Sequence, residues 1–81
     1  MSKSWFVYIL QCADGTYYTG ISNDLAHRLQ AHNAGKGAAY TRGRVPVILK
    51  YQEKFNTHSE AAQREYVIKQ LTRSQKEALI S

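Results

Sequence analysis

The chain has 81 residues and a formal net charge of +5, which is enough for one small domain with a basic surface. Its single cysteine, Cys12, excludes an intramolecular disulfide and a cysteine-based zinc site, and its longest apolar run, WFVYIL, is too short to span a bilayer. We therefore expect one cytoplasmic domain over residues 1–81, with no membrane association and a polyanionic partner such as nucleic acid.

Two short strands joined by a tight turn are predicted first. Residues 5–12, WFVYILQC, are rich in aromatic and β-branched side chains, which favours a strand. Residues 16–21, TYYTGI, follow a short Ala-Asp-Gly segment and are predicted to be the hairpin partner. The pattern therefore predicts an antiparallel β-hairpin at the start of the domain.

The length of the turn decides which tyrosines share a face of this hairpin. A two-residue turn, Asp14-Gly15, would place Tyr17 on the side of Tyr8. A three-residue turn with a left-handed Gly15 would place Tyr18 there instead, and the x-Asp-Gly pattern favours it. We expect Tyr8 and Tyr18 to face the same way, as a catalytic pair or as two tyrosines that only pack across the sheet.

A helix is predicted over residues 22–35, SNDLAHRLQAHNAG, with Ser22 or Asn23 as its N-cap and Gly35 at its end. At 100° per residue, two leucines and His32 fall in one arc, and Arg28 lies one turn before His32. An imidazole on an apolar face is commonly a hydrogen-bonded core residue. The neighbouring Arg28 makes a functional role an open alternative.

A loop is predicted over residues 35–44, GKGAAYTRGR, followed by a strand over residues 45–52, VPVILKYQ. Pro46 near the start of that strand favours an edge position or a strand entry. No acidic residue lies between Asp24 and Glu53, and this interval contains five cations. The segment is interpreted as a phosphate-binding face, and a solvated basic surface is the alternative.

Two further helices are predicted, over residues 57–73 and 74–81, with capping-box spacing at Thr57 and at Ser74. The buried stripe of the first helix is formed by Ala61, Ile68 and Leu71. Glu65 lies in or beside this stripe, where a carboxylate needs a partner. That partner could be Arg28, a tyrosine hydroxyl or a metal ion.

These elements predict an α+β fold, a small three-stranded antiparallel sheet flanked by helices in the order β-β-α-β-α-α. The ordered set of motifs resembles the GIY-YIG nuclease superfamily, in particular its short stand-alone bacterial members. The first motif is FVY at residues 6–8, and the second is YTG at residues 18–20. The site residues that the resemblance implies are Tyr8, Tyr18, Arg28, His32 and Glu65.

The resemblance implies a phosphodiesterase with a single divalent metal ion, Mg²⁺ or Mn²⁺, held by Glu65. Arg28 can bind two phosphate oxygens, while the general base could be Tyr8, Tyr18 or His32. The expected DNA contacts of the basic loop are Lys36, Tyr40, Arg42 and Arg44.

The chain also departs from the family pattern. Phe6 and Val7 stand where the first motif has glycine and isoleucine, Ile21 stands where many members have a basic residue, and the last helix lacks the asparagine that helps to hold phosphate. We expect a structure-selective endonuclease acting on branched or damaged DNA, as in DNA repair. The alternatives are a catalytically weak or inactive nucleic-acid-binding module and a protein-interaction domain with an incidental basic face.

Overall fold

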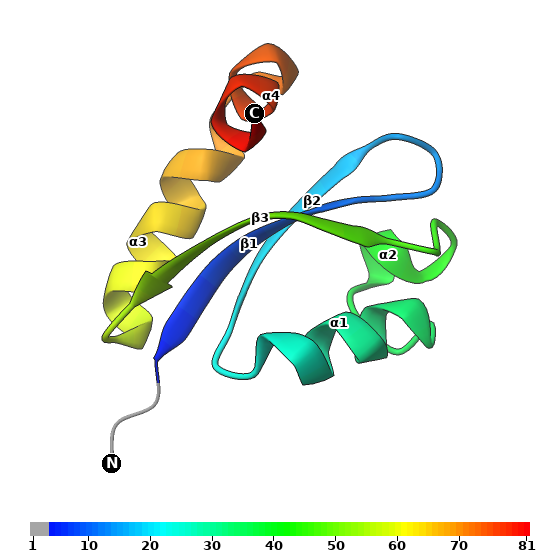
Figure 1. Ribbon diagram of the computed structural model, residues 1–81, viewed down its shortest axis with the longest axis horizontal. Helices are drawn as coiled ribbons and strands as arrows, with labels where there is room; N and C mark the ends of the chain where they lie inside the picture. Colours follow the sequence, from blue (N-terminus) through cyan, green and yellow to red (C-terminus); the bar gives the residue numbers. More distant parts are fainter. Residues whose placement is uncertain (1–3) are drawn as a thin grey trace.

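The computed structural model describes residues 4–81 and shows a three-stranded antiparallel sheet with helices on both faces (Figure 1). The strand order is β2-β1-β3, so the first strand is central and the other two are edges. The elements are β1 (Trp5–Gln11), β2 (Tyr17–Ser22), α1 (Leu25–Asn33), α2 (Ala39–Arg42), β3 (Ile48–Phe55), α3 (His58–Lys69) and α4 (Arg73–Ile80). The predicted fold class and the order of the longer elements are confirmed.

The β1–β2 hairpin has the three-residue turn that the sequence favours. The Cys12 amide donates to the Thr16 carbonyl at 2.8 Å, which leaves residues 13–15 as the loop. Gly15 has φ +85°, a left-handed conformation that glycine adopts without a steric penalty. Tyr8 and Tyr18 consequently pack in the same cluster on one face of the sheet, as predicted.

Alternation along β1 divides the core between the two faces of the sheet. Val7 and Ile9 are fully buried on one face, where they pack with Ala61 and Ile68 of α3. Tyr8 and Leu10 face the other way and pack with leucines of α1. Figure 1 shows α3 on one side of the sheet and α1 with α2 on the other. The period-2 pattern of a central strand therefore supplies both halves of the core.

Several helix boundaries differ from the sequence prediction. The N-cap of α1 is Asp24, whose carboxylate accepts from the His27 amide at 3.2 Å, rather than Ser22 or Asn23. The predicted Thr57 cap of α3 is confirmed, but α3 ends at Lys69, so Leu71 lies beyond it. The N-cap of α4 is Thr72, whose hydroxyl accepts from the Gln75 amide, instead of Ser74. Adjacent hydroxyl and carboxylate residues all suit an N-cap, so sequence alone does not choose among them.

The segment predicted as a loop over residues 35–44 contains the short helix α2, which the prediction missed. A helix of one turn is too short to show a periodic pattern, and the residues just before it are mostly glycine and alanine. β3 is an edge strand that begins at Ile48, two residues after Pro46, in agreement with the expected edge position or strand entry.

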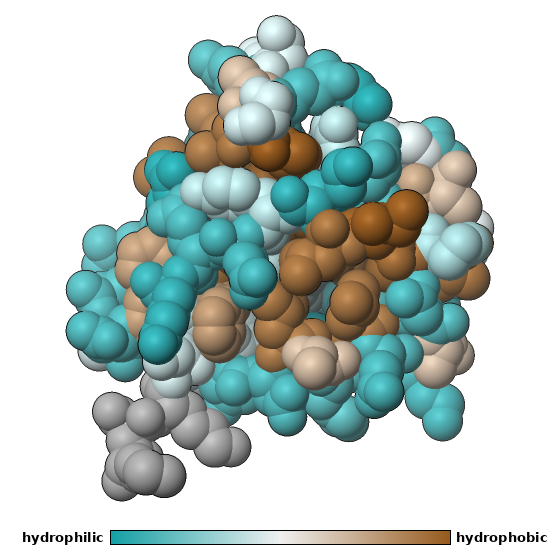
Figure 2. Space-filling model, in the orientation of Figure 1, coloured by the Kyte–Doolittle hydropathy of each residue, from teal (hydrophilic) through white to brown (hydrophobic). Residues whose placement is uncertain are grey.

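The surface is mostly polar, with apolar area gathered near the middle of the face that Figure 2 shows. The exposed large apolar side chains are Tyr40, Val45, Ile48, Tyr66 and Val67. Within residues 4–81, none of the helices has the length and apolar character needed to cross a membrane.

Candidate functional site

A buried hydrogen bond between Tyr8 and His32 forms the centre of the site. The Tyr8 Oη lies 3.0 Å from the His32 Nε2. Tyr8 is 1% exposed and His32 is 0% exposed, so both polar groups depend on partners inside the protein. The strand β1 supplies the tyrosine and the last turn of α1 supplies the histidine. Two residues that the sequence placed in one site are therefore in direct contact.

Thr41 of α2 fixes the protonation pattern of this pair. Its Oγ1 donates to the Ala38 carbonyl at 3.0 Å and lies 2.8 Å from the His32 Nδ1. A hydroxyl has one proton, so both bonds form only when the His32 Nδ1–H donates to the threonine oxygen. The Nε2 of a neutral His32 then has a lone pair, and the Tyr8 hydroxyl donates to it. The order of donation is Tyr8 to His32 to Thr41 to the Ala38 carbonyl.

Two glycines make room for this chain of hydrogen bonds. Gly20 lies opposite Tyr8 in the β1–β2 register, and a Cβ at this position would lie 2.6 Å from the Tyr8 Oη. A Cβ at Gly37 would clash with the His32 Nδ1 and lie 2.9 Å from the His32 Cα. The glycine of the YTG motif therefore permits Tyr8 to reach His32, and Gly37 permits the loop to close over the imidazole.

Burial and the charge of Arg28 shift both pKa values. Burial raises the pKa of the Tyr8 phenol, and the nearby Arg28 guanidinium partly opposes this rise. Burial lowers the pKa of His32, and the positive charge of Arg28 lowers it further. His32 is consequently neutral at neutral pH and available as a proton acceptor. Arg28 is half-buried on α1, beside the pair, as the sequence predicted.

An aromatic rim surrounds the buried pair. The Tyr18 ring lies 5.3 Å from the His32 ring and stacks on the Tyr40 ring at 6.0 Å with an interplanar angle of 27°. The Arg44 guanidinium lies 4.2 Å from the centre of the Tyr40 ring. Tyr40 is exposed, and Tyr18 and Arg44 are partly buried, so this rim lies between the buried pair and the solvent.

Arg44, for which the sequence predicts a phosphate contact, is bonded to groups of the protein itself, and the phosphate contact stays a prediction. Its Nε donates to the Asp14 Oδ2 at 3.0 Å, and its Nη1 donates to the Tyr40 carbonyl at 2.6 Å. The β1–β2 turn is thereby tied to the end of α2. Lys36 and Arg42, the other predicted cations of this loop, are exposed and have no ion pair within residues 4–81.

Glu65 lies near the site on α3, but its partner is neither Arg28 nor a tyrosine. Its Oε2 lies 3.2 Å from the Lys69 Nζ, one helical turn away, and 22% of its side chain is exposed. The negative charge of Glu65 acts on Tyr8 and contributes to raising the phenol pKa. The neighbouring Glu53 is engaged by Arg64 at 2.9 Å and by the Tyr51 hydroxyl, so it belongs to a separate structural network.

The donor set around Glu65 suits a hard cation. Within residues 4–81, no three His, Cys, Asp or Glu side chains are grouped to hold a metal ion. A single carboxylate, with water and phosphate oxygens as the remaining ligands, matches the way in which proteins bind Mg²⁺. A zinc site would require more protein ligands. Glu65 is therefore the residue that could hold the expected Mg²⁺ or Mn²⁺, which stays a prediction.

Thr41 and Gly37 are the site residues that sequence reasoning missed. Both lie in the segment GKGAAYTRGR, for which the basic residues predict only phosphate contacts. The only local signal was a threonine next to Tyr40 between glycines. Their role depends on contact with His32 of α1, which no local pattern reveals.

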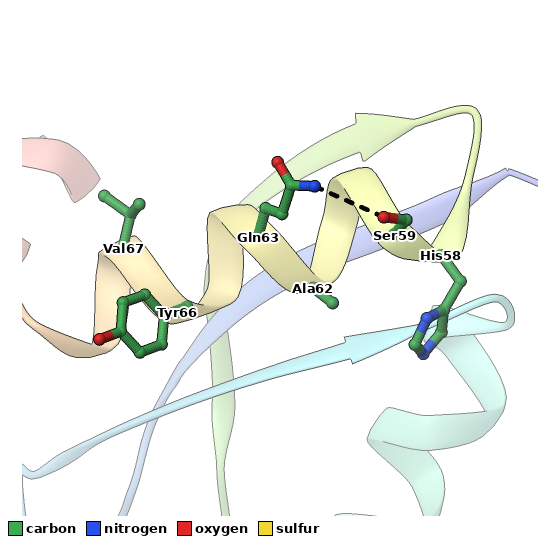
Figure 3. Close-up of a pocket in the computed structure, with 6 residues that line it drawn as sticks. All are labelled: His58, Ser59, Ala62, Gln63, Tyr66 and Val67. Atoms are coloured by element: carbon green, nitrogen blue, oxygen red, sulfur yellow. Dashed lines mark hydrogen bonds between the residues drawn. The ribbon is translucent and has the colours of Figure 1, made fainter.

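A wide hollow lies elsewhere on the described surface. It has a volume of about 610 Å³ and is lined only by residues of α3, as Figure 3 shows: His58, Ser59, Ala62, Gln63, Tyr66 and Val67. None of these residues belongs to the tyrosine–histidine site. This open surface of α3 is therefore separate from the cluster around Tyr8.

A family model and the most similar relatives agree on the family to which this chain is similar. The family described as the GIY-YIG catalytic domain matches residues 4–78. A UPF0213 protein of Halobacterium salinarum is 60% identical over 73 residues, covering 90% of this chain and 95% of the relative. A UPF0213 protein of Oceanobacillus iheyensis is 55% identical over 80 residues, covering 99% of this chain and 93% of the relative.

Two solved structures have the same fold. The solution NMR structure of a UPF0213 protein from Bacillus halodurans has a TM-score of 0.62 at 45% identity, covering 95% of this chain and 82% of that one. The solution NMR structure of a protein from E. faecalis has a TM-score of 0.65 at 46% identity, covering 96% of this chain and 85% of that one.

Proposed function

The chain belongs to the GIY-YIG family, a family of nuclease domains, and from this premise we propose that it is a metal-dependent endonuclease that hydrolyses DNA phosphodiester bonds. The observation that supports this proposal is the buried chain of hydrogen bonds from Tyr8 through His32 to Thr41, with Arg28 beside it. These residues provide a proton acceptor, His32, next to the Arg28 guanidinium, which can bind phosphate. Hydrolysis of a phosphodiester requires both.

The proposed proton path begins at the attacking water. The neutral His32 accepts the phenolic proton of Tyr8 at Nε2, and the Tyr8 oxygen accepts a proton from the water as its oxygen bonds to phosphorus. The bond between phosphorus and the leaving oxygen breaks, and solvent protonates that oxygen. The His32 imidazolium is oriented through the Nδ1–H bond to Thr41 and returns its proton to solvent after the reaction. This path selects Tyr8 with His32 from the three bases that the sequence left open.

Arg28 and Glu65 complete the proposed site. The Arg28 guanidinium donates to two phosphate oxygens and offsets their growing negative charge. Glu65 would hold a divalent cation, which when bound would supply Lewis-acid stabilisation of the phosphate and of the leaving oxygen. When no metal ion is bound, the Glu65 carboxylate is neutralised by its ion pair with Lys69.

The test is a cleavage assay with end-labelled linear, nicked, flapped and four-way-junction DNA in Mg²⁺, Mn²⁺ or EDTA. We expect cutting that requires the metal, with a preference for the branched or nicked substrates. Glu65→Gln should abolish cutting and keep DNA binding, because it removes the metal-binding charge with little change in shape. Glu77→Gln, on the exposed face of α4, is the matched control and should cut like the wild type.

The second candidate function is a nucleic-acid-binding module on the same fold. The absence of an asparagine on α4 (residues 73–80) favours it, because one phosphate-holding group of the family pattern is missing. DNA retardation without cutting in either metal would support this candidate and contradict the endonuclease. A folded protein that does not bind DNA at low salt would contradict both.

A further inference from the structure

We propose that a hollow at the outer edge of β2 is a second phosphate subsite, which binds the DNA strand next to the phosphate held at Arg28. The hollow has a volume of about 180 Å³ and is lined by Tyr17, Tyr18, Thr19, Tyr40, Lys69 and Lys76. The inference rests on the proposed DNA substrate. It concerns where the flanking strand lies and which groups of this chain hold it.

The position of the hollow connects it to the catalytic cluster. β2 is an edge strand, so its outer side is not covered by another strand. Tyr18 lines the hollow and also packs against His32, so the two sites share a wall. A strand with one phosphate at Arg28 can continue past Tyr18 into the hollow.

Two lysines from different helices converge on this hollow. Lys69 comes from α3 and forms an ion pair with Glu65, while Lys76 comes from α4 and has no ion pair within residues 4–81. The side chain of Lys76 is half-buried and brings a positive charge to the wall of the hollow. An anion in the hollow would neutralise it.

Thr19 provides an independent observation that points to a ligand. It is 4% exposed, and its Oγ1 is the one buried side-chain oxygen or nitrogen of the described residues without a hydrogen-bond partner. A buried hydroxyl without a partner costs free energy, and most such groups in proteins are satisfied. The Thr19 hydroxyl is closed to solvent in the structure, so we infer that the side chain rotates toward the hollow, where a phosphate oxygen would accept its hydrogen bond.

The aromatic side chains around the hollow favour a phosphate over a base. The Tyr40 ring is stacked on Tyr18 on one side and covered by Arg44 at 4.2 Å. The Tyr17 ring is covered by Arg73 at 4.7 Å. Each of these rings is already engaged by a neighbouring side chain, which leaves less ring surface on which a nucleobase could stack. The volume is also below the roughly 300 Å³ at which pockets for larger ligands begin, which suits a compact phosphate.

The test compares Lys76→Gln with Lys54→Gln, a matched control on β3 at the opposite edge of the sheet. Binding of a fluorescent DNA duplex is measured by anisotropy in EDTA over a range of salt concentrations. We expect Lys76→Gln to weaken binding about tenfold at low salt and to reduce the salt slope by about 0.9, the value for one phosphate. Lys54→Gln should leave both nearly unchanged.

A second variant separates ligand binding from folding. Thr19→Val removes the hydroxyl and keeps the shape of the side chain. Because that hydroxyl has no partner in the protein, the variant should be at least as stable as the wild type, yet bind DNA about fivefold more weakly. A structural role for Thr19 would instead lower stability and leave affinity unchanged, which would overturn the proposal.

A methylphosphonate scan identifies the phosphate involved. Neutral methylphosphonate replaces one phosphate of the duplex at a time. One position next to the cleavage centre should weaken binding by the wild type more than binding by Lys76→Gln, because the variant has already lost one contact to that phosphate. Equal effects of Lys76→Gln and Lys54→Gln, with intact DNA binding by the wild type, would overturn the subsite alone. A wild type without salt-dependent DNA binding would overturn the proposed function and the subsite with it.

Discussion

At the scale of single residues, the second short motif of the chain has a packing explanation. Gly20 ends the YTG motif, and any larger residue there would push against the Tyr8 hydroxyl, since a Cβ would lie 2.6 Å from it. The tyrosine of the first motif and the glycine of the second are therefore one structural unit. Their pairing in the β1–β2 register places the hydroxyl within reach of His32.

Thr41 is expected to determine which nitrogen of His32 carries the proton. Thr41→Val removes the acceptor of the Nδ1–H, so a neutral His32 should shift its proton to Nε2 and no longer accept from Tyr8. We expect cleavage to fall about 100-fold, the lower range for loss of general-base catalysis, and stability to fall by about 1–3 kcal/mol for the buried group left without a partner.

The ¹⁵N chemical shifts of the His32 ring report this tautomer directly, with or without catalysis. The wild type should show a protonated Nδ1 and an unprotonated Nε2, and Thr41→Val the reverse. Thr41→Ser keeps the hydroxyl and should retain the wild-type spectrum and activity. Identical His32 tautomers in the wild type and in Thr41→Val would show that the threonine is only a packing residue.

At the scale of elements, the sequence predicted the features that follow local rules, such as the hairpin turn. It missed the features that depend on contacts between distant residues. The Ala-Asp-Gly turn has a known geometry, and that geometry correctly placed Tyr8 and Tyr18 on one face. The one-turn helix α2 is too short for a periodic pattern, so the contact between Thr41 and His32 could not be predicted from the sequence. The Lys69 partner of Glu65 was missed as well, because several cations competed for it on charge alone.

The α2 segment also separates two arginines that the sequence treated alike. Arg42 is exposed without an ion pair inside residues 4–81, whereas Arg44 is held by Asp14 and by the Tyr40 carbonyl. We expect Arg42→Gln to reduce the salt slope of DNA binding by about 0.9, as for one lost phosphate contact. Arg44→Gln should change the slope little, because its charge is already paired.

Salt titrations of DNA binding for the two variants measure this difference. Loss of Arg44 should instead loosen Tyr40, seen as a change in the Tyr40 ring resonances by NMR. Its effect on global stability should be small, because the ion pair with Asp14 is exposed to solvent. Equal slope changes for the two variants would show that Arg44 leaves Asp14 to contact DNA.

At the scale of the whole molecule, the site requires almost every element of the fold. Tyr8 comes from β1, Gly20 from β2, His32 from α1, Thr41 from α2 and Glu65 from α3. No two of these elements alone create the chain of hydrogen bonds. The sequence predicted four of these five residues as motif members, but their mutual contacts follow from the tertiary fold. The stability of the molecule and the chemistry of its site therefore depend on the same buried groups.

This dependence predicts a specific loss of stability in acid. His32 has a pKa below its usual 6.5 in the folded protein, because of burial and then of Arg28. Between the lowered value and 6.5 the unfolded chain binds a proton at this position and the folded chain does not, so the free energy of unfolding rises with pH. The stabilisation is fully present above pH 6.5 and is lost as pH falls toward the lowered pKa.

Urea unfolding at pH values from about 7.5 down to 5 measures this slope, within the range in which histidines titrate. The exposed His27 and His58 serve as matched controls, and His27→Gln and His58→Gln should retain the fall in stability below pH 6.5. His32→Gln should be less stable at pH 7.5, since it breaks the bonds to Tyr8 and Thr41, and it should lose most of the slope. A slope that persists in His32→Gln would assign the acid sensitivity to another group and would contradict a neutral, buried His32 as the proton acceptor of the site.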